Sequence, residues 1–148
     1  MGYYEMYVNG DKVGTDVLSP AVSLYAKRSY YLTYDVTPFL RKGRNQIGLW
    51  TSRGWYWPGY PGVKYPCAIA RLQLELGGSA GGPCDIICTD ATWTTRASSH
   101  SILGSWSWND FGGERIDARG DEPRWCTPDS DNAGWLPRRW YNRRPHRL

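Results

Sequence analysis

Tyr3-Tyr4-Glu5-Met6-Tyr7-Val8-Asn9-Gly10-Asp11-Lys12-Val13 is the stretch that decides the fold class. Its first six residues favour an extended strand, because aromatic and β-branched side chains fit a pleated surface. Asn9 and Gly10 both tolerate the positive φ that a type I′ turn requires. The sequence therefore predicts that residues 3–8 fold back onto Lys12 and Val13 as an antiparallel hairpin.

The rest of the chain also has a mainly two-residue period. Residues 71–76, Arg-Leu-Gln-Leu-Glu-Leu, alternate polar and apolar without a break, as expected for a strand with one wet face. Further strands are predicted at 29–36, 46–51, 68–76 and 85–89, separated by polar turns. Thr37-Pro38 favours one short helical turn, and no long amphipathic helix is found. These features predict an all-β antiparallel β-sandwich.

Length and charge set broad limits on the class of protein. The 148 residues suit one domain, expected at residues 1–137. Five arginines lie within residues 138–148, so the net charge of +4 becomes −1 for the rest of the chain. This basic tail is expected to be disordered, and neither a nucleic acid nor a membrane is expected as a partner.

Cysteines and histidines give little support for a catalytic or metal centre. Cys67, Cys84, Cys88 and Cys126 lack the spacing of a zinc site, and two of them share one strand about 13 Å apart. Buried free thiols are favoured, with disulfides left as an alternative. The two histidines and the scattered acids, including Asp117, Asp121 and Glu122, favour solvated turns. No catalytic residue is predicted.

The aromatic loop Gly54 to Gly62 is the first functional signal. It places four large rings among glycines and prolines, where no regular helix or central strand can form. Such rings either close the end of a core or meet a ligand with flat apolar faces, such as a sugar. The predicted carbohydrate-binding residues are Arg53, Trp55, Tyr56, Trp57 and Tyr60. The alternative is that Trp55 and Tyr56 only plug the end of the sandwich.

Ordered motifs along the chain resemble one known family. They comprise the Gly2 to Gly10 segment, Val13-Gly14, Val17-Leu18-Ser19-Pro20, Lys27-Arg28, Tyr34-Asp35-Val36-Thr37, Ile47-Gly48, Gly54-Trp55-Tyr56, Thr89-Asp90 with Trp93, and Gly113-Glu114 with Asp117-Ala118-Arg119. From Gly2 to about Trp135, their order and spacing resemble the N-terminal β-sandwich domain of bacterial α-L-rhamnosidases (glycoside hydrolase family 78). The resemblance implies a jelly-roll-like sandwich similar to galactose-binding domains, and it does not extend to the Arg-rich end.

The resemblance implies an accessory role and not a catalytic one. In that family two carboxyl groups on an (α/α)6 barrel cleave the rhamnoside, and nothing in this chain resembles that barrel. The expected function is a non-catalytic domain that packs on the barrel and binds rhamnose-containing glycans. The alternative is a structural spacer without a ligand. The location is left open, with a periplasmic or secreted parent enzyme favoured over a cytoplasmic one.

Two further sites are implied by the resemblance. A related rhamnose-binding module uses calcium, which implies Asp16 as a ligand. Asn9 and backbone carbonyls of the loop from Trp55 to Tyr65 would be the further ligands. The second site is an interface with the catalytic domain, formed by Trp106, Trp108 and Asp110, with a sugar site at the two indoles as the alternative. Close to it, Glu114 and Arg119 are expected to form a structural ion pair.

Overall fold

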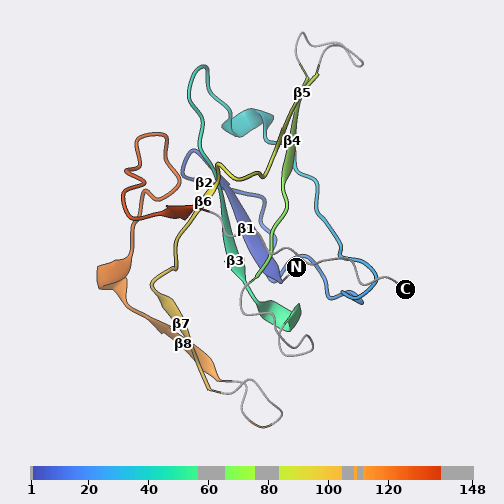
Figure 1. Ribbon diagram of the computed structural model, residues 1–148, viewed down its shortest axis with the longest axis vertical. Coiled ribbons are helices and arrows are strands. Elements are labelled where there is room, and N and C mark those ends of the chain that lie inside the picture. Colours follow the sequence, from blue (N-terminus) through green and yellow to red (C-terminus); the bar gives the residue numbers. More distant parts are fainter. Residues whose placement is uncertain (1, 57–65, 76–83, 105–108, 110–111, 138–148) are drawn as a thin grey trace. The chain divides into compact units, whose positions relative to one another are not determined.

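The chain forms two compact units in a computed structural model, which describes residues 2–56, 66–75, 84–104, 109 and 112–137 (Figure 1). The first unit comprises residues 1–68 and 98–132, and the second comprises residues 69–97 and 133–148. All strand pairs are antiparallel, and the described residues include short 3-10 turns but no α-helix. The all-β antiparallel prediction is therefore confirmed. The prediction of one domain over residues 1–137 stays a prediction.

A three-stranded sheet in the order β2-β1-β3 forms the centre of the first unit. Its strands are β1 (Tyr3–Val8), β2 (Asp11–Val13) and β3 (Ile47–Ser52). Strand β1 pairs with β2 through the predicted turn, where Asn9 and Gly10 have φ of 55° and 94°. It pairs with β3 over its whole length, from Tyr3 opposite Ser52 to Val8 opposite Ile47. The hairpin prediction is confirmed.

Among the described residues, burial is greatest at the turn end of the sheet. Val8 is fully buried and Val13 nearly so. The side-chain amide nitrogen of Asn9 donates at 2.8 Å to the backbone carbonyl of Phe39 and at 2.8 Å to the side-chain oxygen of Asn45. Its side-chain oxygen accepts the Gln46 N–H at 2.9 Å. A buried polar side chain in a turn is thereby satisfied from three directions, which fixes β3 against the hairpin.

One face of this sheet is covered by the segment that contains Trp125 and Cys126. A Cβ added to Gly48 would lie 2.3 Å from the Trp125 ring and 2.7 Å from the Cys126 sulfur, so only glycine fits there. The Trp125 ring also packs edge-on against Tyr7, at a centroid distance of 5.3 Å. Burial raises the pKa of the Cys126 thiol to about 11.

Short elements complete the first unit. The 3-10 turns are η1 (Thr37–Phe39), η2 (Gly54–Tyr56) and η3 (Ala118–Gly120). The Thr37-Pro38 prediction of a short turn is confirmed, and the carboxylate of Asp35 accepts the Thr37 N–H at 2.9 Å. A two-stranded ribbon consists of β7 (His100–Leu103) and β8 (Gly113–Ile116), paired from His100 opposite Ile116 to Leu103 opposite Gly113.

The second unit contains two separate strand pairs. Strand β4 (Arg71–Glu75) pairs with β5 (Cys84–Cys88), and β6 (Thr94–Thr95) pairs with β9 (Leu136–Pro137). The alternation predicted from residue 71 onward is observed, with Leu72 and Leu74 less exposed than their neighbours. Every residue of β5 is exposed.

Three sequence predictions need correction. Residues 29–36 form no strand, and the ribbon of β7 and β8 was not predicted as strands. All four cysteines are free, as favoured, but Cys84 and Cys88 are exposed and not buried, because they belong to the exposed strand β5. In the described part of the chain, no helix has the length and apolar character needed to cross a membrane.

Candidate functional site

The two segments predicted as ligand sites are both attached to the first residues of β1. Tyr3 packs against the corner that follows β3, where a Cβ on Gly54 would lie 2.6 Å from the Tyr3 ring. Tyr4 donates its backbone N–H to Ser19 at 2.9 Å, which holds the loop that contains Asp16. The structure therefore brings the Asp16 loop and the start of the aromatic loop to the same end of the sheet.

Of the predicted carbohydrate-binding residues, the structure describes two with their side chains. Arg53 is half-buried between β3 and η2. Tyr56 is 5% exposed and packs edge-on against Tyr25 with a centroid distance of 5.2 Å. The Tyr56 ring therefore packs inside the first unit and holds the turn after β3 in place. The backbone of Trp55 lies in η2, and its side chain, like Trp57 and Tyr60, falls outside the described residues.

Asp16 belongs to a small cluster of phenols. The hydroxyl of Tyr34 donates to its carboxylate at 3.4 Å, and a Cβ on Gly14 would lie 3.0 Å from the Tyr34 ring. Burial is the main cause that raises the pKa of Tyr34, and the Tyr4 phenol and the Asp16 carboxylate raise it further. Burial also raises the pKa of Tyr4. Both phenols therefore stay protonated at neutral pH and act as hydrogen-bond donors.

The predicted calcium ligands do not form a complete set among the described residues. Asp16 is exposed and offers one carboxylate. Asn9 is buried, and its side-chain amide is used in the three structural hydrogen bonds described above. No group of three or more His, Cys, Asp or Glu able to hold a metal is found among the described residues. The loop carbonyls at 57–65 lie outside those residues, so calcium stays a prediction.

The predicted interface residues Trp106, Trp108 and Asp110 also lie outside the described residues. The ion pair predicted close to them is wrong in its partners. Arg119 pairs with Asp117 at 2.7 Å, because the Asp117 side chain caps η3 and the guanidinium two residues later reaches the same carboxylate. This contact lowers the pKa of Asp117. Glu114 instead lies 3.8 Å from the Nδ1 atom of His100.

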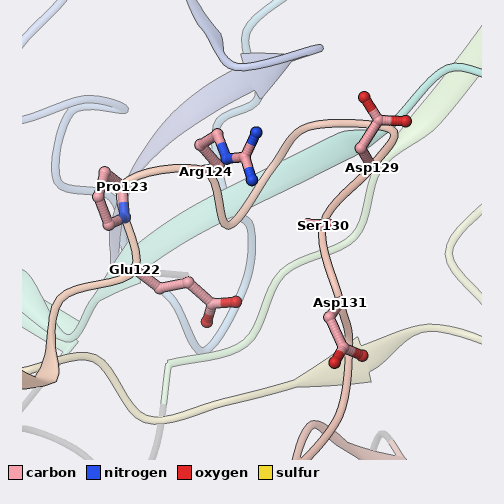
Figure 2. Close-up of a pocket in the computed structure, with 6 residues that line it drawn as sticks. All are labelled: Glu122, Pro123, Arg124, Asp129, Ser130 and Asp131. Atoms are coloured by element: carbon pink, nitrogen blue, oxygen red, sulfur yellow. The ribbon is translucent and has the colours of Figure 1, made fainter.

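A shallow hollow of about 270 Å³ lies in the loop around residues 122–131. Figure 2 shows its lining on two arms of this loop, with Glu122, Pro123 and Arg124 on one arm and Asp129, Ser130 and Asp131 on the other. The lining contains three carboxylates and one guanidinium. The hydroxyl oxygen of Ser130 is buried and has no hydrogen-bond partner among the described residues. One loop supplies the whole lining, so a ligand there would be held by this loop alone.

Sequence reasoning missed one arrangement of side chains in the first unit. Trp50, in the middle of β3, is 38% exposed, and its ring contacts the ring of His100 at a centroid distance of 4.8 Å. Glu5 lies directly opposite Trp50 on β1. No local motif signals this arrangement, because Trp50 and His100 are fifty positions apart and meet only through the tertiary fold.

The comparisons with known proteins address the whole chain. A family model described as "Alpha-L-rhamnosidase N-terminal domain" matches residues 1–148. The chain belongs to this family. The match includes the Arg-rich end of the domain, which the resemblance noted in the sequence did not reach.

Relatives of this rhamnosidase domain are much longer chains. An α-L-rhamnosidase of Formosa agariphila is 33% identical over 144 residues, which cover 91% of this chain and 14% of that protein. An α-L-rhamnosidase of Streptomyces avermitilis is 34% identical over 143 residues, covering 92% and 13%. The solved structure of the α-L-rhamnosidase from Dictyoglumus thermophilum matches with a TM-score of 0.78 and 31% identity, covering 93% of this chain and 14% of that one. The chain therefore spans about one seventh of the proteins it matches.

Proposed function

We propose that this domain is a non-catalytic accessory part of an α-L-rhamnosidase that binds rhamnose-containing glycans and packs on the catalytic part of the enzyme. Family membership gives the context, since the relatives named as α-L-rhamnosidases are about seven times longer than this chain. The binding surface proposed is the end of the sheet where β1 begins.

The convergence of two loops at that end is the observation that carries the proposal. The backbone at Gly54 packs closely against the Tyr3 ring, and the buried Tyr56 ring packs against the Tyr25 ring. The aromatic loop therefore starts from a fixed base, which reduces the ordering cost of presenting Trp57 and Tyr60 to a ligand. The Asp16 loop, attached through Tyr4, adds a carboxylate and a phenol that can bond sugar hydroxyls.

A structural spacer without a ligand is the second candidate. The burial of Tyr56 favours it, because that ring acts in packing and leaves no face for a sugar. On this alternative the remaining rings of the loop would likewise contact protein, in the way that apolar side chains at an interface do.

Binding can be measured by titrating the isotope-labelled chain with L-rhamnose and following backbone and indole N–H resonances. The expected result is a set of shift changes near Arg53 and in the aromatic loop, with a dissociation constant in the millimolar range. Trp57→Ala should abolish these changes. Trp57→Phe keeps a ring and should retain them in weakened form.

The other two outcomes have distinct signatures. A spacer would show no shift change with L-rhamnose at any concentration tested, yet would form a complex when mixed with the catalytic part of its parent enzyme. Release of nitrophenol from an aryl rhamnoside by the pure 148-residue chain would contradict the non-catalytic assignment.

A further inference from the structure

Trp50 is a large, partly exposed side chain near the middle of strand β3. Its neighbour on the same face of β3, Gly48, is buried against Trp125, and the next residue on that face, Ser52, is exposed. Trp50 lies between them with 38% of its surface exposed. The ring therefore sits at the point where the covered part of this face ends, held by the strand and open to solvent.

Two hydrogen-bonding side chains are neighbours of Trp50. The His100 ring stands nearly perpendicular to the indole, with an interplanar angle of 89°, and Glu114 lies 3.8 Å from His100. Glu5 occupies the opposite position in the strand register, where Cβ atoms lie about 5 Å apart.

The carboxylate of Glu5 is kept in a fixed position. Lys12 donates to one of its oxygens, and the hydroxyl of Tyr7 donates to the other at 2.8 Å. The hydrogen bond from Lys12 is the main cause that lowers the pKa of Glu5. Glu5 is thus an ionised acceptor at neutral pH, and about a third of its side chain stays exposed beside the indole.

The ribbon adds apolar surface to the same place. Residues that are directly opposite in an antiparallel pair share one face, so His100, Ile116, Ile102 and Glu114 lie on the same face of β7 and β8. Ile116 is 56% exposed and Ile102 is 41% exposed. Aliphatic side chains therefore continue the surface beyond His100, next to a carboxylate.

The chemistry of this surface fits a sugar better than a protein. Cores of protein interfaces are depleted in charged residues, whereas here Glu5 lies opposite Trp50 and Glu114 lies beside His100. A pyranose has a C–H face that can lie on an indole, and hydroxyls at its edge that carboxylates and imidazole can bond. A 6-deoxyhexose also has a methyl group, for which the exposed isoleucines offer contacts.

We propose that Trp50, with Glu5, His100 and Glu114, forms a second binding subsite for a 6-deoxyhexose, built from residues outside the aromatic loop. The proposal rests on the proposed function for its ligand class alone. Its residues come from β1, β3 and the ribbon, all of them within the first unit.

The test uses the isotope-labelled chain and follows the indole N–H resonance of Trp50, assigned by its loss in Trp50→Phe. We expect this resonance to shift with L-rhamnose, and to do so equally in the Trp57→Ala variant that lacks the loop site. Trp50→Ala should remove the shifts of the Glu5, His100 and Glu114 backbone N–H groups, or weaken binding there about tenfold.

Ligand and protein controls narrow the interpretation. L-rhamnitol keeps the configuration of the hydroxyls at C2 to C4 but has no ring face, so it should leave the Trp50 resonance unmoved. L-mannose, which carries a hydroxyl in place of a hydrogen on the methyl carbon, should bind more weakly than L-rhamnose. Tyr31→Ala removes another strongly exposed ring of the same unit, 84% exposed, and should change nothing at Trp50.

Three results would overturn the subsite. A Trp50 resonance that stays still while resonances of the aromatic loop shift would remove the second subsite and leave the proposed function intact. Equal shifts with L-rhamnitol would remove sugar-ring recognition at Trp50. The absence of any shift in the whole spectrum would remove both this inference and carbohydrate binding as the function.

Discussion

The two ends of β1 differ in how the chain uses them. At the Val8 end, Asn9 is buried and bonded on three sides, and Cys126 is 2% exposed. At the Tyr3 end, the strand supports two loops, and Asp16 in one of them is exposed. Stability is concentrated where the hairpin turns, which leaves the opposite end able to carry varied loops without loss of the fold.

The largest effect is expected at Gly48. Gly48→Ala would place a methyl group 2.3 Å from the Trp125 ring, so the covering segment would have to move away from the sheet. We expect the free energy of unfolding to fall by about 3 kcal/mol, measured by urea unfolding. Gly113→Ala is the matched control, since an added Cβ there meets nothing within 4 Å. Equal losses in the two variants would contradict the close packing at Gly48.

Asn9→Ala should cost somewhat less, about 2 kcal/mol, because it removes three hydrogen bonds and leaves the Gln46 N–H unsatisfied. Asn109→Ala provides the comparison, since Asn109 also has a positive φ, of 79°, but is exposed. Its cost should be limited to the strain of that backbone conformation, about 1 kcal/mol. If both variants unfold at the same urea concentration, the buried network contributes nothing beyond the turn.

Alkaline pH should weaken the Val8 end first, before Tyr4 and Tyr34 at the other end, whose pKa values are also raised from 10.0, begin to contribute. The folded pKa of Cys126 is raised from 9.0 to about 11, so its stabilising effect is complete below pH 9 and is lost as the pH rises towards 11. Tyr7, with a pKa raised from 10.0 to about 12, adds a further loss above pH 10. The thermal midpoint should therefore begin to fall near pH 9. In Cys126→Ala the fall should begin near pH 10, while Cys84→Ser, at an exposed position, should behave as wild type.

The smallest effect is expected at the Tyr3 end. Asp16→Asn should change the free energy of unfolding by less than about 0.5 kcal/mol, because the carboxylate is exposed and accepts one long hydrogen bond. Thermal unfolding with and without millimolar calcium chloride measures the metal prediction in the same samples. A midpoint that rises with calcium in wild type and not in the variant would support a calcium site. Identical midpoints would contradict it.

Local patterns sufficed for the hairpin and for the strands that alternate. Asn9-Gly10 needs no tertiary information, since both residues accept positive φ. Residues 29–36 were wrongly predicted as a strand because Tyr30 and Tyr31 have high β-propensity. In the described structure this segment pairs with no other strand, and both tyrosines are exposed. Propensity for a strand reflects packing against neighbours, which one segment cannot reveal.

The candidate site depends on contacts that no local pattern encodes. The aromatic loop and Asp16 were predicted from composition and from resemblance, but their common attachment to Tyr3 and Tyr4 follows from the register of β1 and the loop contacts. The strands β7 and β8 were missed because each has four residues, too few to show a period. Without them, the meeting of His100 and Trp50 could not be predicted.

The Asn9 network has a consequence for the order in which the chain folds. A hairpin with a short turn closes within microseconds, whereas β3 joins it across more than thirty residues of intervening chain. The Asn9 side chain links these local and distant steps, because it can bond Gln46 only after the turn has formed. Amide protons at this junction, those of Asn9 and Gln46, should be the last to exchange with deuterated solvent, since releasing them requires the whole sheet to open.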